Sequence, residues 1–190
     1  MFACIFAPQL PVDLSLPEFA YGFSPLVEEV RTGTVVIDVD GCELLFGSPY
    51  QLARAVSDRA KKSRTEGGLE SVVTVAIAAN PDVAIHAATN LQGVTFVSPG
   101  EELTCIGEFP VDGIDYSLID LEKKVVDEIL ETLRLWGVHT FAEFASLPVA
   151  GVSERLGQSG IKLQQHFVVA HRVRQRQLAL VRRLIFELHA

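Results

Sequence analysis

Short apolar runs dominate the first hundred residues, and their spacing is typical of strands. The run FACIFA is apolar and predicts a buried strand, and SVVTVAIA predicts a second strand. Thr32-Gly33 separates two further runs and predicts a hairpin turn, because glycine adopts a positive φ at little cost. The predicted strands are 2–7, Leu26–Arg31, Thr34–Val39, Ser71–Ala78 and Gly93–Val97.

Three helix starts share one pattern, a polar capping residue followed by proline. The pairs are Ser48-Pro49, Asn80-Pro81 and Ser98-Pro99. Gln51 and Glu101 stand three residues after their serines, the spacing of a capping box. The pattern predicts helices from Pro49 to about Lys62 and from Pro81 to Asn90, with a short helical turn after Pro99. The prolines of residues 8–22 indicate an irregular connection.

From Leu118 the apolar period lengthens to four residues, which indicates amphipathic helices. The predicted helices are Leu118–Trp136, Phe141–Leu147, Val149–Leu156 and Ile161–Leu188. The whole pattern predicts an α+β fold, with a mostly antiparallel sheet and helices packed on one side, followed by a small all-α domain. We place the α+β domain at 1–110, the helical domain at 111–165 and a basic C-terminal helix at 166–190.

Composition limits the class of protein. The 190 residues are 48% hydrophobic and 21% charged, which suits one globular domain or two small ones. No apolar run is long enough to span a bilayer, and the N-terminus has no basic segment or cleavage pattern typical of a signal peptide. The three cysteines are widely spaced and form no CxxC pair, so we expect no disulfide framework or zinc site and a cytoplasmic location.

Charge is distributed unevenly along the chain. The formal net charge is −8, but residues 150–190 hold seven basic and two acidic side chains. This asymmetry predicts that any contact with phosphate involves the C-terminal part. The alternative is a solvated basic helix face without a partner.

Five stretches resemble a known family. They are FSPLVEEVRTGTVVIDVDGCELLFGSP, TVAIAANPDVAIHAA, GVTFVSPGEE, GEFPVDGI and LRLWGVHTFAEFASLP. Together they resemble the Y-family (UmuC/DinB-like) DNA polymerases, and most closely the ImuB-like mutasome subunits. The resemblance implies a palm for the α+β domain, a thumb with helix-hairpin-helix elements for the helical domain, and a role in DNA repair, translesion synthesis and SOS mutagenesis. It also implies that the fingers region is deleted near 11–22 and that the little-finger domain is missing.

The family's metal-binding carboxylates have no counterpart at the matching positions. Active members hold two Mg²⁺ ions with an aspartate on the first strand and an Asp-Glu pair at the hairpin. Here Phe6 or its neighbour matches the strand position, and Gly33 and Thr34 match the pair. We therefore expect no catalytic residue, no metal site and no cofactor, although active relatives use Mg²⁺. A metal site built from Asp38, Asp40 and Glu43 is the alternative, because the first two share a strand face.

The helical part contains the candidate DNA-binding residues. The family's hairpin glycines match Gly113 and Gly137, and Thr140 could hold a phosphate at a helix start or simply cap that helix. Asp112 and Asp115 place negative charge beside the first hairpin. The remaining candidates are the cations Lys162, Arg172, Arg174 and Arg176.

Gln177-Leu178-Ala179-Leu180-Val181 resembles the peptide by which polymerase partners bind the sliding clamp. Gln177, Leu178 and Leu180 are the candidate contacts, and an ordinary core stripe is the alternative. The expected function is a non-catalytic adaptor, or DNA-associated subunit, that binds DNA, the sliding clamp or other mutasome proteins. The alternatives are a small DNA-binding module acting through the basic helix and a truncated remnant of a polymerase gene.

Overall fold

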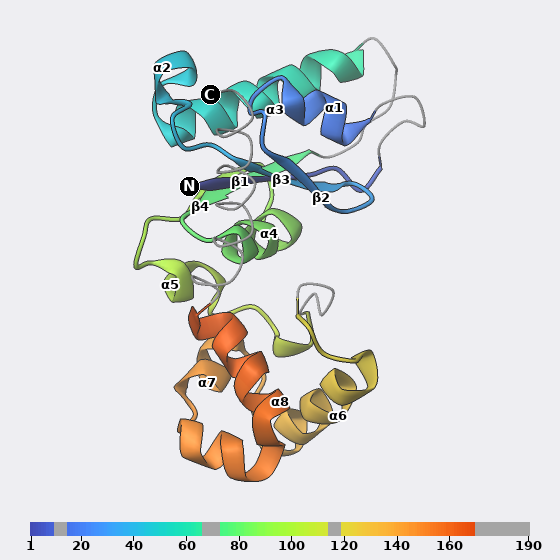
Figure 1. Cartoon of the computed structure of the whole chain (residues 1–190), viewed down its shortest axis with the longest axis vertical. Coiled ribbons are helices and arrows are strands. Elements are labelled where there is room, and N and C mark those ends of the chain that lie inside the picture. Colours follow the sequence, from blue (N-terminus) through green and yellow to red (C-terminus); the bar gives the residue numbers. More distant parts are fainter. Residues whose placement is uncertain (10–14, 66–72, 114–118, 170–190) are drawn as a thin grey trace, which may run out of the picture. The chain divides into compact units, whose positions relative to one another are not determined.

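The computed structural model describes residues 1–9, 15–65, 73–113 and 119–169 (Figure 1). The chain forms two compact units, which divide between Pro99 and Gly100. The first unit is an α+β sheet structure and the second is helical. The predicted fold class is therefore confirmed.

The first unit is built on a five-stranded sheet with the strand order β2-β3-β1-β4-β5. Its strands are β1 (Phe2–Phe6), β2 (Val27–Arg31), β3 (Thr34–Asp38), β4 (Thr74–Ala78) and β5 (Val94–Phe96). All neighbouring strands are antiparallel except β4 and β5, which are parallel. Gly33 has a φ of +78° in the β2–β3 turn, as predicted for this hairpin.

Helices cover both faces of this sheet, which corrects the expectation that they lie on one side. Helices α1 (Leu16–Tyr21) and α3 (Pro49–Thr65) lie on one face, and α4 (Pro81–Asn90) lies on the other (Figure 1). Strands β3 and β4 are buried at every position, because α4 covers the face of the sheet that α1 and α3 leave open. The structure also contains two helices that the sequence pattern did not predict, α1, which lies in the proline-rich segment, and the short α2 (Glu43–Phe46).

Two of the three predicted helix caps are present. The Gln51 side chain accepts a hydrogen bond from the Ser48 N–H at 2.7 Å, and Asn80 accepts one from the Asp82 N–H at 2.8 Å. The cap predicted at Ser98 is wrong, because the next helix begins only at Glu102. The glycine at position 100, with a φ of +92°, turns the chain before that helix.

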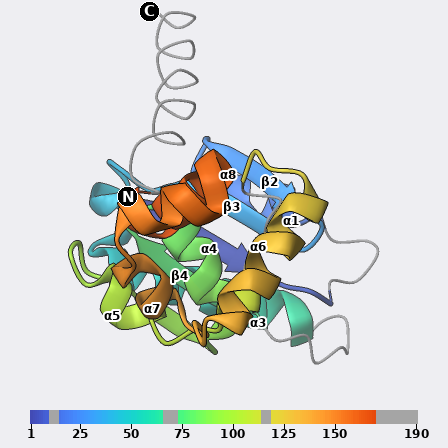
Figure 2. The same ribbon diagram turned by 90° about the horizontal axis from the view of Figure 1, so that it is seen from below.

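The second unit contains α5 (Glu102–Ile106), a 3₁₀ turn (Val111–Gly113), α6 (Lys123–Leu135), α7 (Phe141–Ser146) and α8 (Val149–Val169). Helix α8 packs against both α6 and α7 (Figures 1 and 2). Gly157 interrupts α8 with a non-helical φ of 64°, close to the predicted break between two helices. Phe141, Phe144, Leu133 and Leu163 are fully buried and form the centre of this unit. In the described part of the chain, no helix is long and apolar enough to cross a membrane.

Candidate functional site

The first candidate site is the turn region, which we define as Phe6 and Ala7 after β1 together with the β2–β3 turn (Arg31–Thr34). Strand register places Phe6 opposite Thr34, and the Ala7 N–H donates a hydrogen bond to the Gly33 carbonyl at 2.8 Å. The structure therefore brings together the positions that match the family's catalytic carboxylates.

Backbone contact closes the turn region around Gly33. A Cβ atom on Gly33 would lie 2.7 Å from the Ala7 carbonyl oxygen, and the positive φ is itself unfavourable for other residues. A side chain at position 33 therefore requires the turn to move away from β1.

The polar side chains of the turn region are not those that bind divalent ions. Thr34 is fully buried, and its hydroxyl oxygen accepts a hydrogen bond from the Arg31 Nε at 3.3 Å. Mg²⁺ prefers carboxylate oxygens, and a guanidinium beside the site would repel it. The turn region contains no carboxylate, so its residues do not fit the two-metal centre that the resemblance implies for active polymerases.

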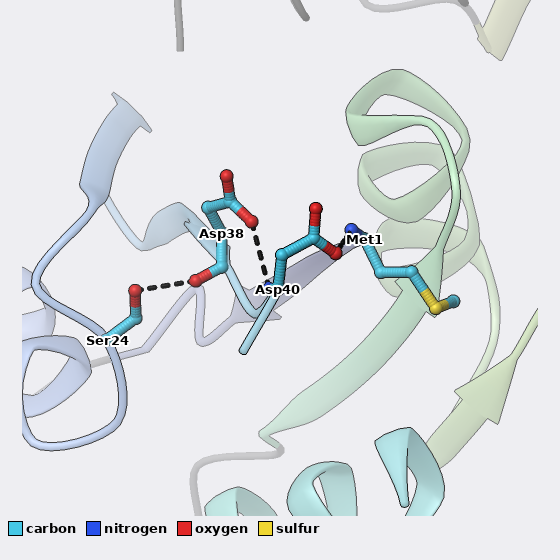
Figure 3. A network of polar contacts seen from close by, with 4 residues as sticks. All are labelled: Met1, Ser24, Asp38 and Asp40. Atoms are coloured by element: carbon cyan, nitrogen blue, oxygen red, sulfur yellow. Dashed lines mark hydrogen bonds and ion pairs between the residues drawn. The ribbon is translucent and has the colours of Figure 1, made fainter. Parts of the chain in front are cut away.

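Asp38 and Asp40 lie at the other end of β3, away from the turn region (Figure 3). Asp38 is buried, and its carboxylate accepts a hydrogen bond from the Asp40 N–H at 3.0 Å. The Ser24 hydroxyl donates to the Asp38 carbonyl at 2.6 Å, and the Asp40 carboxylate contacts the amino group of Met1. These contacts are those of a strand-end turn. Across the described ranges, no group of three or more His, Cys, Asp or Glu side chains has the geometry of a metal site.

The second candidate site is the pair of helical hairpins in the second unit. The segment before the 3₁₀ turn runs beside the start of α7, and an isolated bridge joins Pro110 to Thr140. The Gly113 N–H, a candidate phosphate donor, donates to the Pro110 carbonyl at 3.0 Å. The Gly137 N–H donates to the Arg134 carbonyl at 3.0 Å. Both glycine amides are thus used within the chain.

Thr140 caps α7 in a complete capping box, as the alternative for this residue predicted. Its hydroxyl oxygen accepts from the Glu143 N–H at 3.2 Å. In return, one Glu143 carboxylate oxygen accepts from the N–H groups of His139 at 2.6 Å and Thr140 at 3.0 Å. A carboxylate of the chain therefore occupies the place where a phosphate would meet this helix start.

These two amide hydrogen bonds, first from His139 and then from Thr140, lower the pKa of the Glu143 carboxyl. A carboxyl whose pKa is lowered on folding stabilises the fold above the unfolded-state pKa of about 4.3, and this contribution is lost as the pH falls through the folded-state value. We expect acid to destabilise the wild-type chain more than the Glu143→Gln variant, as measured by urea unfolding at decreasing pH. The exposed Glu154→Gln is the control, and an equal effect of both variants would contradict the assignment.

The other predicted DNA-binding residues are spread over different segments. Lys162 lies on α8, and its ammonium group is 3.7 Å from the Asp120 carboxylate. Residues 100–169 hold twelve acidic and five basic side chains. Arg172, Arg174, Arg176, Gln177, Leu178 and Leu180 lie outside the described residues.

Sequence reasoning did not single out Ala7, beyond matching the strand position to Phe6 or its neighbour, and it missed Glu143. Ala7 carries no chemical signal, since its importance comes only from its contact with the turn. Glu143 stands three residues after Thr140, and this capping-box spacing could have identified it as the ligand of the hairpin amides.

The sheet with helices on both faces, followed by a helical unit, shares its fold with part of a solved DinB structure. No model of a known protein family matches the chain. Over 135 residues it is 28% identical to DNA polymerase IV 2 of Mesorhizobium japonicum, a match covering 71% of this chain and 30% of that protein.

Solved structures share the fold. DinB from Sulfolobus solfataricus superimposes with a TM-score of 0.59 at 14% identity, over 82% of this chain and 43% of that one. An insertion ternary complex of Dbh DNA polymerase gives a TM-score of 0.57 at 16% identity, over 81% and 42% of the two chains. Together with the sequence match, these likenesses support homology to the DinB, or Y-family, DNA polymerases. The chain spans less than half the length of these relatives.

Proposed function

We propose that this chain is a non-catalytic relative of the Y-family polymerases and acts as an adaptor or DNA-associated subunit in translesion synthesis and damage-induced mutagenesis. This is the role of the ImuB-like subunits that its sequence resembles. In this proposal the α+β unit is a palm-like scaffold and the helical unit is thumb-like. The contact of Gly33 with the Ala7 carbonyl, at the place of the catalytic carboxylates, carries the proposal.

The turn region argues against phosphoryl transfer by the family's mechanism. That mechanism needs carboxylates that hold two divalent ions against the attacking and leaving oxygens. In this chain the matching positions are Phe6 or its neighbour, a glycine and a buried threonine, and none of them is a carboxylate. A protein with this fold and without these carboxylates can still bind other macromolecules.

We further propose that DNA contact, if the adaptor makes it directly, falls mainly to Arg172, Arg174 and Arg176. The hairpin amides of Gly113 and Gly137 already donate within the chain, and Lys162 faces Asp120. The excess of acidic side chains in residues 100–169 also opposes a DNA backbone. Clamp binding through Gln177, Leu178 and Leu180 completes the proposal.

The test is metal binding at the turn region, followed through backbone amide NMR signals with Mn²⁺ as a paramagnetic probe. We expect no selective broadening of the Ala7, Gly33 and Thr34 signals, whereas an active DinB polymerase should show it at the matching positions. Asp38→Asn is the control for binding of Mn²⁺ to other carboxylates.

Primer extension with Mg²⁺ and with Mn²⁺ supplies a second readout. We expect no nucleotide incorporation. Selective broadening at the turn region, or incorporation that Thr34→Ala abolishes, would refute the non-catalytic assignment. Because the chain spans less than half of its solved relatives, the metal-binding result carries more weight than inactivity alone.

A further inference from the structure

An open apolar groove lies on the second unit, between the end of α6 and the start of α8. It is lined by Trp136, Leu147, Pro148, Gly151, Val152 and Arg155, and its volume is about 290 Å³. That volume is at the lower end of the range for ligand sites, roughly 300–1,000 Å³. It suits one or two side chains of a larger partner.

The groove is open because Gly151, which lines it, has no side chain to fill it. A Cβ atom on Gly151 would meet nothing within 4 Å, so the first turns of α8 leave space above this glycine. The proline at position 148 and Leu147 form the connection that leads into α8. The groove therefore results from a glycine in the first turns of α8 and from the Leu147-Pro148 connection before that helix.

The rim of the groove includes a tryptophan that is partly accessible. Trp136 lines the groove and is 38% exposed. Val149 and Leu135 are 58% and 78% exposed, and each is next in sequence to a residue that lines the groove. Tryptophan and arginine often carry much of the binding energy at protein interaction sites.

Arg155 adds an uncompensated positive charge at this rim. Its guanidinium carbon lies 5.9 Å from the centroid of the Trp136 ring. Among the residues that the structure describes, no carboxylate pairs with Arg155, whereas the neighbouring Arg134 binds Glu131 at 2.7 Å. A partner that places a carboxylate here would form a charge-assisted, potentially bidentate contact.

We propose that this groove binds a peptide segment of a partner protein that inserts an apolar side chain beside Trp136 and directs an acidic side chain to Arg155. The charge of Arg155 favours an acidic side chain, and the apolar lining of the groove favours an apolar one. Nucleic acid fits less well, because the groove offers one cation, Arg155 lies over the Trp136 ring, and the surrounding unit is acidic. The groove and the turn region belong to different units, so either proposal can fail without the other.

The experiment selects random dodecapeptides displayed on phage against the whole chain and then titrates the enriched peptides as synthetic probes. Trp136 is the single tryptophan of the chain, so its fluorescence reports directly on the groove. We expect the enriched peptides to combine aromatic or aliphatic side chains with Asp or Glu and to change this fluorescence on binding. Replacing their acidic residue by its amide should weaken binding about tenfold.

Variants of the chain separate binding from folding. Arg155→Gln should weaken binding about tenfold, and Arg155→Lys should restore part of the loss. Gly151→Leu should place a side chain in the groove and abolish binding while leaving the circular dichroism unchanged, since a Cβ atom at position 151 meets no atom within 4 Å. The matched control is Lys124→Gln, which removes an exposed cation elsewhere in the second unit and should leave binding unchanged.

The proposal is wrong if no apolar acidic peptide is enriched, or if the enriched peptides bind the Gly151→Leu variant as tightly as the wild type. A salt-sensitive response of Trp136 to a single-stranded oligonucleotide, without a response to peptides, would instead assign the groove to nucleic acid. Sedimentation that depends on concentration and is lost in Gly151→Leu would assign it to a second copy of the chain.

Discussion

Replacing Leu133 by alanine should destabilise the second unit by about 2–5 kcal/mol. Leu133 lies on α6 and is fully buried, so its removal leaves a cavity as well as losing apolar burial. Urea unfolding followed through the fluorescence of Trp136, which belongs to the same unit, measures the loss.

Leu135 provides the matched control for this prediction. It is the same residue type on the same helix, two positions away, but is 78% exposed. Leu135→Ala should change the free energy of unfolding by less than about 0.5 kcal/mol. Equal losses from the two variants would mean that α6 does not pack through the face that holds Leu133.

Introducing a side chain at Gly33 should also be costly. Gly33→Ala combines an unfavourable positive φ with a Cβ 2.7 Å from the Ala7 carbonyl oxygen. We expect the free energy of unfolding to fall by about 2–5 kcal/mol, as measured by urea unfolding followed by circular dichroism.

Gly41→Ala separates the two contributions at Gly33. Gly41 has a similar φ of +83°, but a Cβ there meets nothing within 4 Å. Its substitution should therefore cost only about 1–2 kcal/mol, the cost of the backbone conformation itself. If both variants lost the same stability, the close approach of the turn to β1 would have no energetic weight.

The sequence pattern predicted local structure well where the cause was local. The helix starts at Pro49 and Pro81 follow from a capping side chain and a proline that fits the first helical turn. Helix α1 has the same pattern, with Ser15 capping and Pro17 in the first turn, but the surrounding prolines favoured an irregular connection. Ser98-Pro99 shows the opposite error, because the same motif precedes a turn at Gly100.

The placement of α4 could have been predicted from the strands themselves. The residues of β3 and β4 are buried at every position, whereas a sheet with one solvated face would alternate. Continuous apolar runs such as Thr74–Ala78 therefore already required a second covering layer.

The candidate sites depended more on contacts that no local pattern contains. Sequence alone could predict that Gly33 and Thr34 match the positions of the family's carboxylates. It could not show that the Ala7 N–H binds the turn, or that Trp136 and Arg155 meet across α6 and α8. These contacts join residues far apart in the chain, so they can be recognised only from the three-dimensional structure.

The two edge strands of the sheet affect how readily the protein aggregates at high concentration. Strand β2 is interrupted by a register shift between Glu29 and Arg31 and carries charged side chains, and β5 has only three residues. An edge strand that is irregular, charged or very short is a poor template for pairing with a strand of another molecule. We therefore expect the folded chain to resist fibril formation even though almost half of its residues are hydrophobic.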